Sequence, residues 1–298
     1  MGVAIGAVGV SLLEFWYFWW NGWSLFDWEV RGGDLTGGSQ WLSVYVVMGF
    51  PWLLFSLNRI SSWRMRAGFA LGLVVLFLGL WVSHTRAALV AVGAQLVTYF
   101  CLRMFRRGWV AAGCVVLLVS IVFGVSWLPE KYQDRFFAST ITNPLSLQIR
   151  LNTWMLAAQD VVAQPLLGLG YGKHSFHKVH PDWPPEVEPV HLHIHNTFYA
   201  KMVQIGLPGF LLFVWIFGRL IKIAYALYQN APTAFSGKFA LSILVMTVGL
   251  IVRNLFDDML IGTVAYLFWL VAGLLVWISC WGKPERWQSI KGAKCDTT

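Results

Sequence analysis

Long apolar runs separated by short polar segments recur along the whole chain. Their lengths approach the roughly 20 residues that an α-helix needs to cross a bilayer. None alternates polar and apolar residues as the strands of a membrane barrel do. The runs cover residues 2–20, 41–57, 67–83, 87–102, 108–128, 202–218, 239–252 and 259–281. We therefore predict an all-α, polytopic integral membrane protein with about eight transmembrane helices.

More than half of the basic residues gather in every second connection between these runs or in the C-terminal segment. Short cytoplasmic loops collect Lys and Arg, so the basic side is assigned to the cytoplasm. The basic residues on that side are Arg59, Arg64, Arg66, Arg103, Arg106, Arg107, Arg219, Lys222, Lys238, Lys283, Arg286, Lys291 and Lys294. The opposite side, which we expect to be periplasmic, receives the segments 21–40, 83–86, 129–201 and 253–258.

This topology predicts one membrane domain in three parts. Residues 1–128 are N-terminal transmembrane helices, 129–201 form a large periplasmic catalytic loop with amphipathic helices, and 202–298 are C-terminal transmembrane helices with a cytoplasmic tail. The first run has no basic residue before it and no clear small-residue cleavage site. It is therefore interpreted as a retained span and not as a removed signal peptide.

Composition supports the membrane assignment and argues against nucleic acid as a partner. Hydrophobic residues make up 57% of the chain and charged residues 12%, with a net charge of +8. More than half of the basic residues lie at cytoplasmic helix ends, where topology and anionic membrane lipid account for them. Cys101, Cys114, Cys280 and Cys295 also lie at or near these ends, so no structural disulfide is expected.

An amphipathic helix is predicted in the long outer segment, over residues 147–163. It is started by Asn143, Pro144 and Ser146 and closed before Pro165. Its predicted apolar stripe is Leu147, Leu151, Trp154, Ala158 and Val161. The glycines that follow, Gly168, Gly170 and Gly172, have no βαβ unit around them, so a nucleotide loop is disfavoured and a tight, close-packed return of the chain is predicted.

The histidines are confined to the predicted outer side. They are His84, His174, His177, His180, His191, His193 and His195. His195 directly precedes the sixth run, where an imidazole can accept a proton at neutral pH. A zinc site is the alternative for these histidines, because imidazole is a common zinc ligand. The irregular setting of the three histidines at 174, 177 and 180, with no cysteine nearby, favours solvated loop side chains, and no metal or cofactor is expected.

Arginines reach the same outer face near the membrane boundary. Arg86 lies in the short connection 83–86, Arg150 one turn before Trp154, and Arg253 in the last outer turn. A guanidinium group pairs with phosphate oxygens in bidentate geometry, so a lipid-linked phosphate is a natural ligand. The alternative for each arginine is interfacial anchoring, with the charge snorkelling to water.

Three segments resemble, in order, the motifs of the O-antigen ligase and polymerase family. His195-Asn196 is followed by nine residues and then Gly206-Leu-Pro-Gly209, the most specific match. Arg150-Leu-Asn-Thr-Trp154, followed by Gln-Pro-Leu-Leu-Gly-Leu-Gly, is similar to the family's Arg-to-Trp helix and its exit. Thr85-Arg86-Ala87 is similar to its Ser-Arg-Gly element. The resemblance covers about residues 40–280, and family members have further spans ahead, so a short or N-terminally truncated member is expected.

The resemblance implies a metal-independent, inverting glycosyltransferase of the bacterial inner membrane. Its donor is an undecaprenyl-diphosphate-linked glycan, with Arg86 and Arg150 on the diphosphate and His195 as the base. With a lipid A-core acceptor the enzyme is an O-antigen ligase of lipopolysaccharide biosynthesis, which we favour. A polymerase using a glycan acceptor and a protein O-oligosaccharyltransferase stay open. A transporter would need interrupted paired helices and inverted repeats, which the pattern does not reveal.

Several further residues are candidates for supporting roles. Asn196 can orient the imidazole or cap the following helix, and Trp154 belongs to the arginine motif. Arg253, Asp257 and Asp258 lie in the last outer turn, where they either bind the acceptor or form a local ion pair. Glu14 lies inside the first run, where a carboxylate is costly and marks a pathway or a polar partner.

Overall fold

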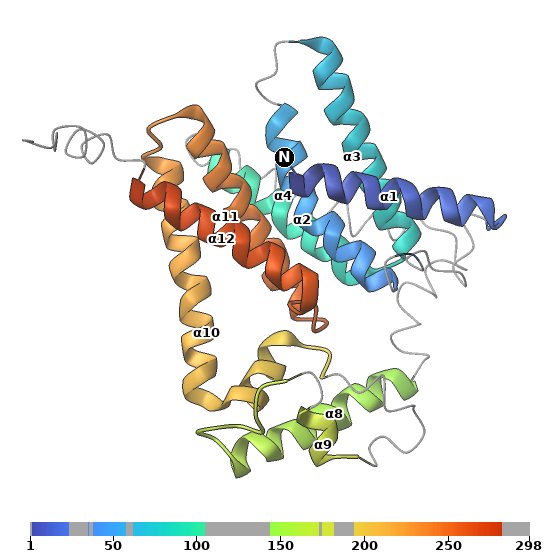
Figure 1. The fold of residues 1–298 in the computed structure, drawn as a ribbon. Coiled ribbons are helices and arrows are strands. Elements are labelled where there is room, and N and C mark those ends of the chain that lie inside the picture. Colours follow the sequence, from blue (N-terminus) through green and yellow to red (C-terminus); the bar gives the residue numbers. More distant parts are fainter. Residues whose placement is uncertain are drawn as a thin grey trace, which may run out of the picture. The chain divides into compact units, whose positions relative to one another are not determined.

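The computed structural model describes residues 2–23, 35, 38–57, 62–104, 144–172, 175–181 and 194–281. Within them the regular elements are helices, and no strand is present (Figure 1). The described helices are α1 (Gly2–Trp20), α2 (Ser39–Leu57), α3 (Trp63–Ser83), α4 (Arg86–Met104), α8 (Pro144–Ala163), α9 (Ser175–Val179), α10 (Thr197–Gln229), α11 (Ala234–Asn254) and α12 (Gly262–Trp281). The predicted all-α class is confirmed.

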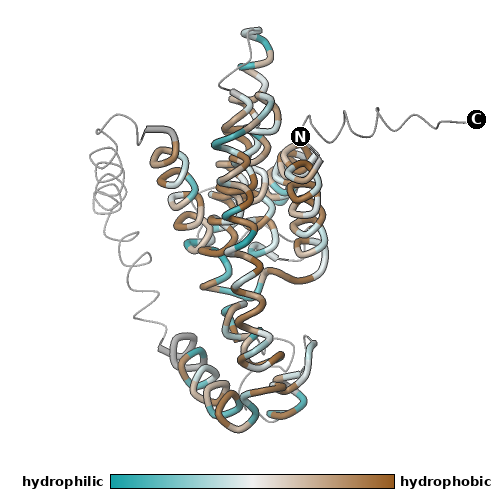
Figure 2. Tube along the Cα trace, turned by 90° about the vertical axis from the view of Figure 1, so that its left-hand side faces the viewer, coloured by the Kyte–Doolittle hydropathy of each residue, from teal (hydrophilic) through white to brown (hydrophobic). Residues whose placement is uncertain are grey.

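Five of the described helices are long and apolar enough to cross a membrane, namely α1, α3, α10, α11 and α12. Hydrophobic residues run along these long helices in Figure 2. α4 is apolar over a shorter length. The predicted run 41–57 forms the helix α2, which is not among these five. The predicted run 108–128 lies outside the described residues. The chain is therefore a multi-pass membrane protein, while the number of eight spans and the periplasmic side stay predictions.

The chain divides into two compact units. The first unit consists of Met1–Gln95, Trp215–Arg253 and Met259–Thr298, and the second of Leu96–Val214 and Asn254–Asp258. In the first unit α1, α2 and α3 pack against one another. Small residues allow this close approach: a Cβ added to Gly49 would lie 2.5 Å from the Cβ of Ala7, and one added to Gly79 would lie 2.6 Å from Ser11 Oγ.

Glu14 belongs to the buried face of α1, together with Ala7 and Ser11. Its side chain is almost fully buried, at 1% exposure. Because Ala7 and Ser11 meet α2 and α3, this carboxylate faces the interior of the helix packing in the first unit.

The connection between α3 and α4 is as tight as the sequence predicted. α3 ends at Ser83 and α4 begins at Arg86. His84 caps α3 in the left-handed conformation, with φ 47°, and its N–H donates to the carbonyl of Trp81 at 3.0 Å. Arg86 is thereby fixed as the first residue of α4, half-buried in the first unit.

The second unit is built around a small core of its own, formed by α8, α9 and the start of α10. Its buried members are Ala157, Phe176, Ile194, Ala200 and Val203, and the side chains that pack against them are Trp154, Leu156, Val161, Leu169 and Tyr199. These residues come from three sequence segments, so the core holds the outer segment and the start of α10 together.

The predicted amphipathic helix is confirmed as α8, which starts with Pro144 as its first helical residue. The predicted apolar stripe is partly wrong. Trp154 and Val161 do pack on the core, but Leu151 and Ala158 are exposed, and the buried alanine is Ala157. The error arises because α8 carries apolar residues on two faces, and the second face is exposed.

Candidate active site

A break in α10 positions the start of this helix. Gly206 has φ 67° and ψ 179° and is followed by Pro208 two residues later. The N–H of Leu207 donates to the carbonyl of Pro165 at 2.7 Å, outside the helix. Pro208 has no N–H to donate. The carbonyls of Val203 and Gln204 therefore lose their partners within α10.

The Pro165–Gly170 segment supplies the missing donors. The N–H of Leu169 donates to Val203 O at 2.9 Å, and the N–H of Gly170 donates to Gln204 O at 3.1 Å. These bonds satisfy the carbonyls that the break exposes.

Glycine is required on both sides of this contact. Gly168 and Gly206 both have positive φ, at 66° and 67°. A Cβ on Gly168 would meet the carbonyl oxygen of Val203, and a Cβ on Gly206 would meet that of Leu166. The predicted close-packed return of the chain is confirmed at Gly168. The interruption of α10 is a feature that the sequence analysis did not predict.

His195 lies just before α10 in a strained backbone conformation, with φ 52°. The residue before it is fixed, because Trp154 Nε1–H donates to Ile194 O at 2.7 Å. Trp154 is fixed in turn, since the Tyr199 hydroxyl donates to the carbonyl of Trp154 at 2.7 Å. The arginine-to-tryptophan motif of α8 and the His-Asn motif are therefore in direct contact within the second unit.

Asn196 caps α10. Its Oδ1 accepts the N–H of Tyr199 at 3.0 Å, three residues along, which is the usual N-cap geometry. Its carbonyl accepts the N–H of Ala200 at 2.8 Å. Capping is thus the confirmed role of the two predicted for this residue.

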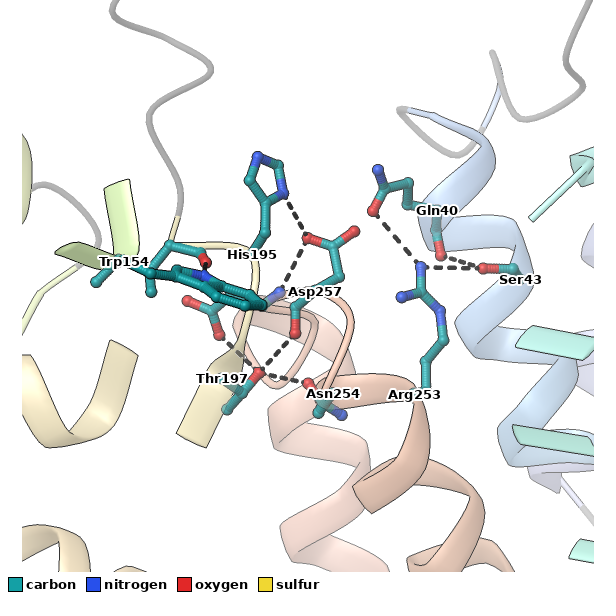
Figure 3. A network of polar contacts seen from close by, with 10 residues as sticks. Gln40, Ser43, Trp154, His195, Thr197, Arg253, Asn254 and Asp257 are labelled. Carbon is teal, nitrogen blue, oxygen red and sulfur yellow. Dashed lines mark hydrogen bonds and ion pairs between the residues drawn. The ribbon is translucent and has the colours of Figure 1, made fainter. Parts of the chain in front are cut away.

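The imidazole of His195 meets Asp257, as Figure 3 shows. His195 Nδ1 and Asp257 Oδ1 are 3.4 Å apart, a long contact. The same oxygen accepts the N–H of Asp258 at 2.9 Å, which fixes the carboxylate. A carboxylate at Nδ1 favours the tautomer with the proton on Nδ1 and the lone pair on Nε2, as a general base requires.

Thr197 ties the start of α10 to the turn that carries Asp257. Its hydroxyl lies near Asn254 Oδ1, the carbonyl of Asp257 and Asp258 Oδ1, the last at 2.9 Å. A single hydroxyl donates to one of these at a time. The backbone N–H of Thr197 also donates to Asp257 O, at 3.2 Å. Two segments some 60 residues apart in sequence are held together at the candidate base.

Arg150 and Arg86 belong to different units. Arg150 lies four residues before Trp154 in α8, so the two share one helix face, and Trp154 contacts the residue next to His195. Arg150 is half-buried, as is Arg86. Arg86 lies in the first unit, so its place beside the second unit stays a prediction.

Arg253 is buried in the first unit at 1% exposure. Its Nη2 lies 3.4 Å from Ser43 Oγ and 3.5 Å from Gln40 Oε1, both in α2 (Figure 3). These contacts connect α11 to α2. The other two residues of the last outer turn, Asp257 and Asp258, contact His195 and Thr197 in the second unit.

His180 corrects the prediction of solvated loop histidines. Its Nε2 lies 2.9 Å from Asp160 Oδ2, and its ring is 4.8 Å from that of Phe176. It directly follows α9, a short helix in a segment predicted to be irregular. Of the other two, His174 and the side chain of His177 lie outside the described residues, as do His191 and His193. The described residues hold no group of three or more metal-ligating side chains.

Lys201 and Gln204 are polar residues that the sequence analysis missed. Both are buried in α10 ahead of its break, at 5% and 6% exposure. Lys201 Nζ donates to Gln204 Oε1 at 3.0 Å. The available signal was a charge at the start of an otherwise apolar helix, which is easily interpreted as a snorkelling residue.

Comparison with known proteins agrees with these motifs. Residues 71–214 match the family model described as O-Antigen ligase, a range that includes Arg86, Arg150 and His195. A protein of Rickettsia conorii named "Putative polysaccharide ligase" is 23% identical over 252 residues, which cover 83% of this chain and 55% of that protein. One of the same name from Rickettsia felis is 22% identical over 205 residues, covering 64% and 45%.

The chain thus spans about half the length of the curated relatives that it matches. The matched range contains the three segments on which the resemblance was based, and the second unit brings two of them into contact. Over residues 71–214, just under half of its length, the chain is similar to the O-antigen ligase family.

Proposed function

We propose that this chain is an O-antigen ligase that transfers a glycan from undecaprenyl diphosphate to a lipid A-core acceptor at the periplasmic face of the inner membrane. The observation that carries the proposal is the contact between His195 and Asp257, made beside the motif helix α8. A histidine held by a carboxylate at one ring nitrogen is suited to accept a proton at the other.

In the proposed reaction, Nε2 of His195 takes the proton of an acceptor hydroxyl while its oxygen attacks the anomeric carbon of the donor. The bond from that carbon to the diphosphate breaks, and undecaprenyl diphosphate leaves with the electron pair. Attack opposite the leaving group inverts the anomeric configuration. Asp257, with its carboxylate fixed by the N–H of Asp258, stabilises the imidazolium that forms.

The leaving diphosphate gains negative charge as this bond breaks, and guanidinium groups are suited to stabilise it. Arg150 is the candidate in the second unit, because it shares a helix face with Trp154, which contacts the residue before His195. Arg86 is the second candidate, taken from the family motif. The chain's own residues suffice for the chemistry as written, so the proposed transfer is independent of metal.

A polymerase or a protein O-oligosaccharyltransferase would use the same donor chemistry with another acceptor. A transporter shares one feature with this chain, an interrupted helix. The open carbonyls at the break in α10 are, however, bonded by Leu169 and Gly170 within the second unit. These hydrogen bonds account for the break by packing within the second unit, so the break does not by itself indicate a transport site.

The proposal is tested by lipopolysaccharide gels of a ligase-deficient bacterium that expresses this chain. We expect the parent chain to restore O-antigen ladders, and His195→Ala and Arg150→Ala to abolish them at equal membrane abundance. Arg219→Ala is the matched control, because Arg219 is an exposed arginine of α10 in the first unit. Ladders that persist in His195→Ala would overturn the assignment of the base. Long glycans on the lipid carrier, without transfer to lipid A-core, would identify a polymerase.

A further inference from the structure

We propose that Lys201, Gln204 and Tyr171 form a subsite in the second unit for an anionic group, phosphate or carboxylate, carried by the sugar substrate. The proposal rests on the glycan transfer proposed above and adds a substrate feature to it. It concerns residues that lie beyond the His-Asn motif and that the arginine motifs do not include.

Burial of Lys201 is the first observation. The residue is 5% exposed. Among the described residues, its ammonium group contacts Gln204 Oε1 at 3.0 Å and the ring of Tyr171, whose centroid lies 4.8 Å away. Taking an ammonium group out of water is costly unless an opposite charge or several hydrogen bonds compensate it. An amide oxygen and one aromatic face compensate only part of that cost.

The second observation is that the positive charge of Lys201 has no carboxylate close by among the described residues. Within the described part of the chain, no carboxylate oxygen lies within 4.0 Å of the Lys201 ammonium. Asp258 acts on it electrostatically from a greater distance, while its Oδ1 lies 2.9 Å from the Thr197 hydroxyl. An ammonium has three N–H donors, and Gln204 accepts one of them. A phosphate or carboxylate group would accept the others and supply the missing charge.

Tyr171 gives the subsite its exposed wall. Its side chain is 78% exposed, although its ring covers the buried ammonium. It lies between Gly170 and Gly172, with φ 96° and 153°, at the end of the segment that docks on the α10 break. The exposed face of an aromatic ring attracts the partly positive C–H groups of a sugar. The proposal requires the phenol side chain of Tyr171 to move aside from the ammonium group. A sugar stacked on the ring would then bring a charged substituent beside Lys201.

The distance to the candidate base fits a neighbouring group of the same substrate. Lys201 lies four residues after Thr197, which places the two on one face of α10, about 6 Å apart along the axis. Thr197 contacts both Asp257 and Asp258, beside His195. A group bound at Lys201 would therefore lie about one helical turn from Thr197, which contacts the aspartate that meets His195.

Binding to the purified full-length chain in phosphatidylcholine nanodiscs tests the proposal by calorimetry. The probes are glucose 1-phosphate, glucuronate and inorganic diphosphate, with neutral glucose for comparison. We expect Lys201→Met to weaken the binding of the two charged sugars by about tenfold, the usual effect of losing a hydrogen bond to a charged group. Lys222→Met is the matched control, because Lys222 is an exposed lysine of the same helix and should bind as the parent does.

The probes separate the possible sources of the anion. Tighter binding of glucose 1-phosphate or glucuronate than of diphosphate assigns the subsite to a charged sugar, and the reverse order assigns it to the leaving group of the donor. Nanodiscs that contain phosphatidylglycerol test a lipid headgroup. Loss of sugar binding in these discs, dependent on Lys201, would overturn the assignment to a substrate.

Two further measurements, the thermal midpoint and ladder formation, distinguish a binding role of Lys201 from a structural one. They also separate a failure of the subsite from a failure of the proposed function. Removing a buried ammonium without a carboxylate partner should leave the thermal midpoint of Lys201→Met unchanged or higher. A lower midpoint with unchanged binding would overturn the proposal. If Lys201→Met forms ladders and binds probes as the parent does while His195→Ala forms none, the subsite fails and the ligase stands. Binding that depends on Lys201, in a chain that forms no ladders, supports the subsite and contradicts the ligase.

Discussion

His195 and His180 each meet an aspartate in the second unit, at nitrogen–oxygen distances of 3.4 and 2.9 Å. His180 follows α9 with ordinary backbone angles, whereas His195 is in the left-handed region. Asp160, the partner of His180, lies within α8, and the contact joins α8 to the end of α9. The shorter contact, His180–Asp160, therefore connects α8 to the end of α9. The longer contact, His195–Asp257, is made by a residue with a strained backbone.

The two histidine–aspartate pairs differ more in their surroundings than in their nitrogen–oxygen distances. His180 packs on Phe176, a member of the core of the second unit. Around His195, backbone and side-chain hydrogen bonds from Trp154, Thr197 and Asp258 fix the flanking residue and the carboxylate. Such support around a strained residue is typical of functional sites. From this comparison we infer that the His180–Asp160 pair, with the shorter contact, is structural. The His195–Asp257 pair, which more neighbouring hydrogen bonds support, stays the proposed catalytic pair.

Replacing each histidine with alanine should give the largest contrast. We expect His195→Ala to lower glycan transfer by about 100- to 10,000-fold, the range for losing a general base. His180→Ala should retain transfer per folded molecule, because its contacts join α8 to α9. The measurement is ladder formation normalised to chain abundance. Equal losses in the two variants would show that His195 has no special role.

The sequence predicted the helices better than their interactions. α8 was predicted because Pro144 and the proline at 165 mark its ends, whereas its stripe was partly wrong, because Leu151 and Ala158 belong to a second apolar face. The break in α10 was missed. The carbonyls that this break exposes accept hydrogen bonds from residues some 35 positions earlier in the chain. No local sequence pattern predicts such a contact.

The same limit applies to the site. His195 was predicted from its place before an apolar run, and Asn196 from its capping chemistry. Asp257 was predicted to bind the acceptor or to form a local ion pair, and its contact with His195, 62 residues away, was not predicted. His180 was interpreted as a solvated side chain, because its partner Asp160 lies on another helix. Pairings across elements depend on packing, so the structure was needed to separate these two histidines.

Replacing each aspartate with asparagine tests the carboxylates alone. Asp257→Asn should lower transfer by about 10- to 100-fold, by analogy with the partners that orient metal-bound histidines. Asp160→Asn keeps the shape of the side chain and should leave the rate unchanged. Initial rates with purified chain, donor and acceptor are the measurement. A rate for Asp257→Asn equal to that of the parent would contradict the role of Asp257.

Supporting aromatic residues provide a finer test. Trp154→Phe removes the N–H that donates to Ile194 O, a loss of about 1 kcal/mol for a neutral hydrogen bond. Because Ile194 precedes His195, we expect up to about fivefold slower transfer. Phe176→Leu, beside His180, should lower the thermal midpoint without slowing transfer per folded molecule. An unchanged rate in Trp154→Phe would show that the bond only stabilises the fold.

The smallest expected effect is the coupling within the His180–Asp160 pair. Both side chains are partly buried, at 21% and 11% exposure, so solvent screens the contact in part. A double-mutant cycle of His180→Ala and Asp160→Ala should give a coupling of about 0.5 to 1 kcal/mol in the free energy of unfolding. The same cycle measured on the transfer rate should give none, because the pair contacts neither His195 nor Asp257 directly. Coupling in the rate instead would mean that α8 and α9 transmit this contact to the base, and the separation of a structural pair from a catalytic pair would fail.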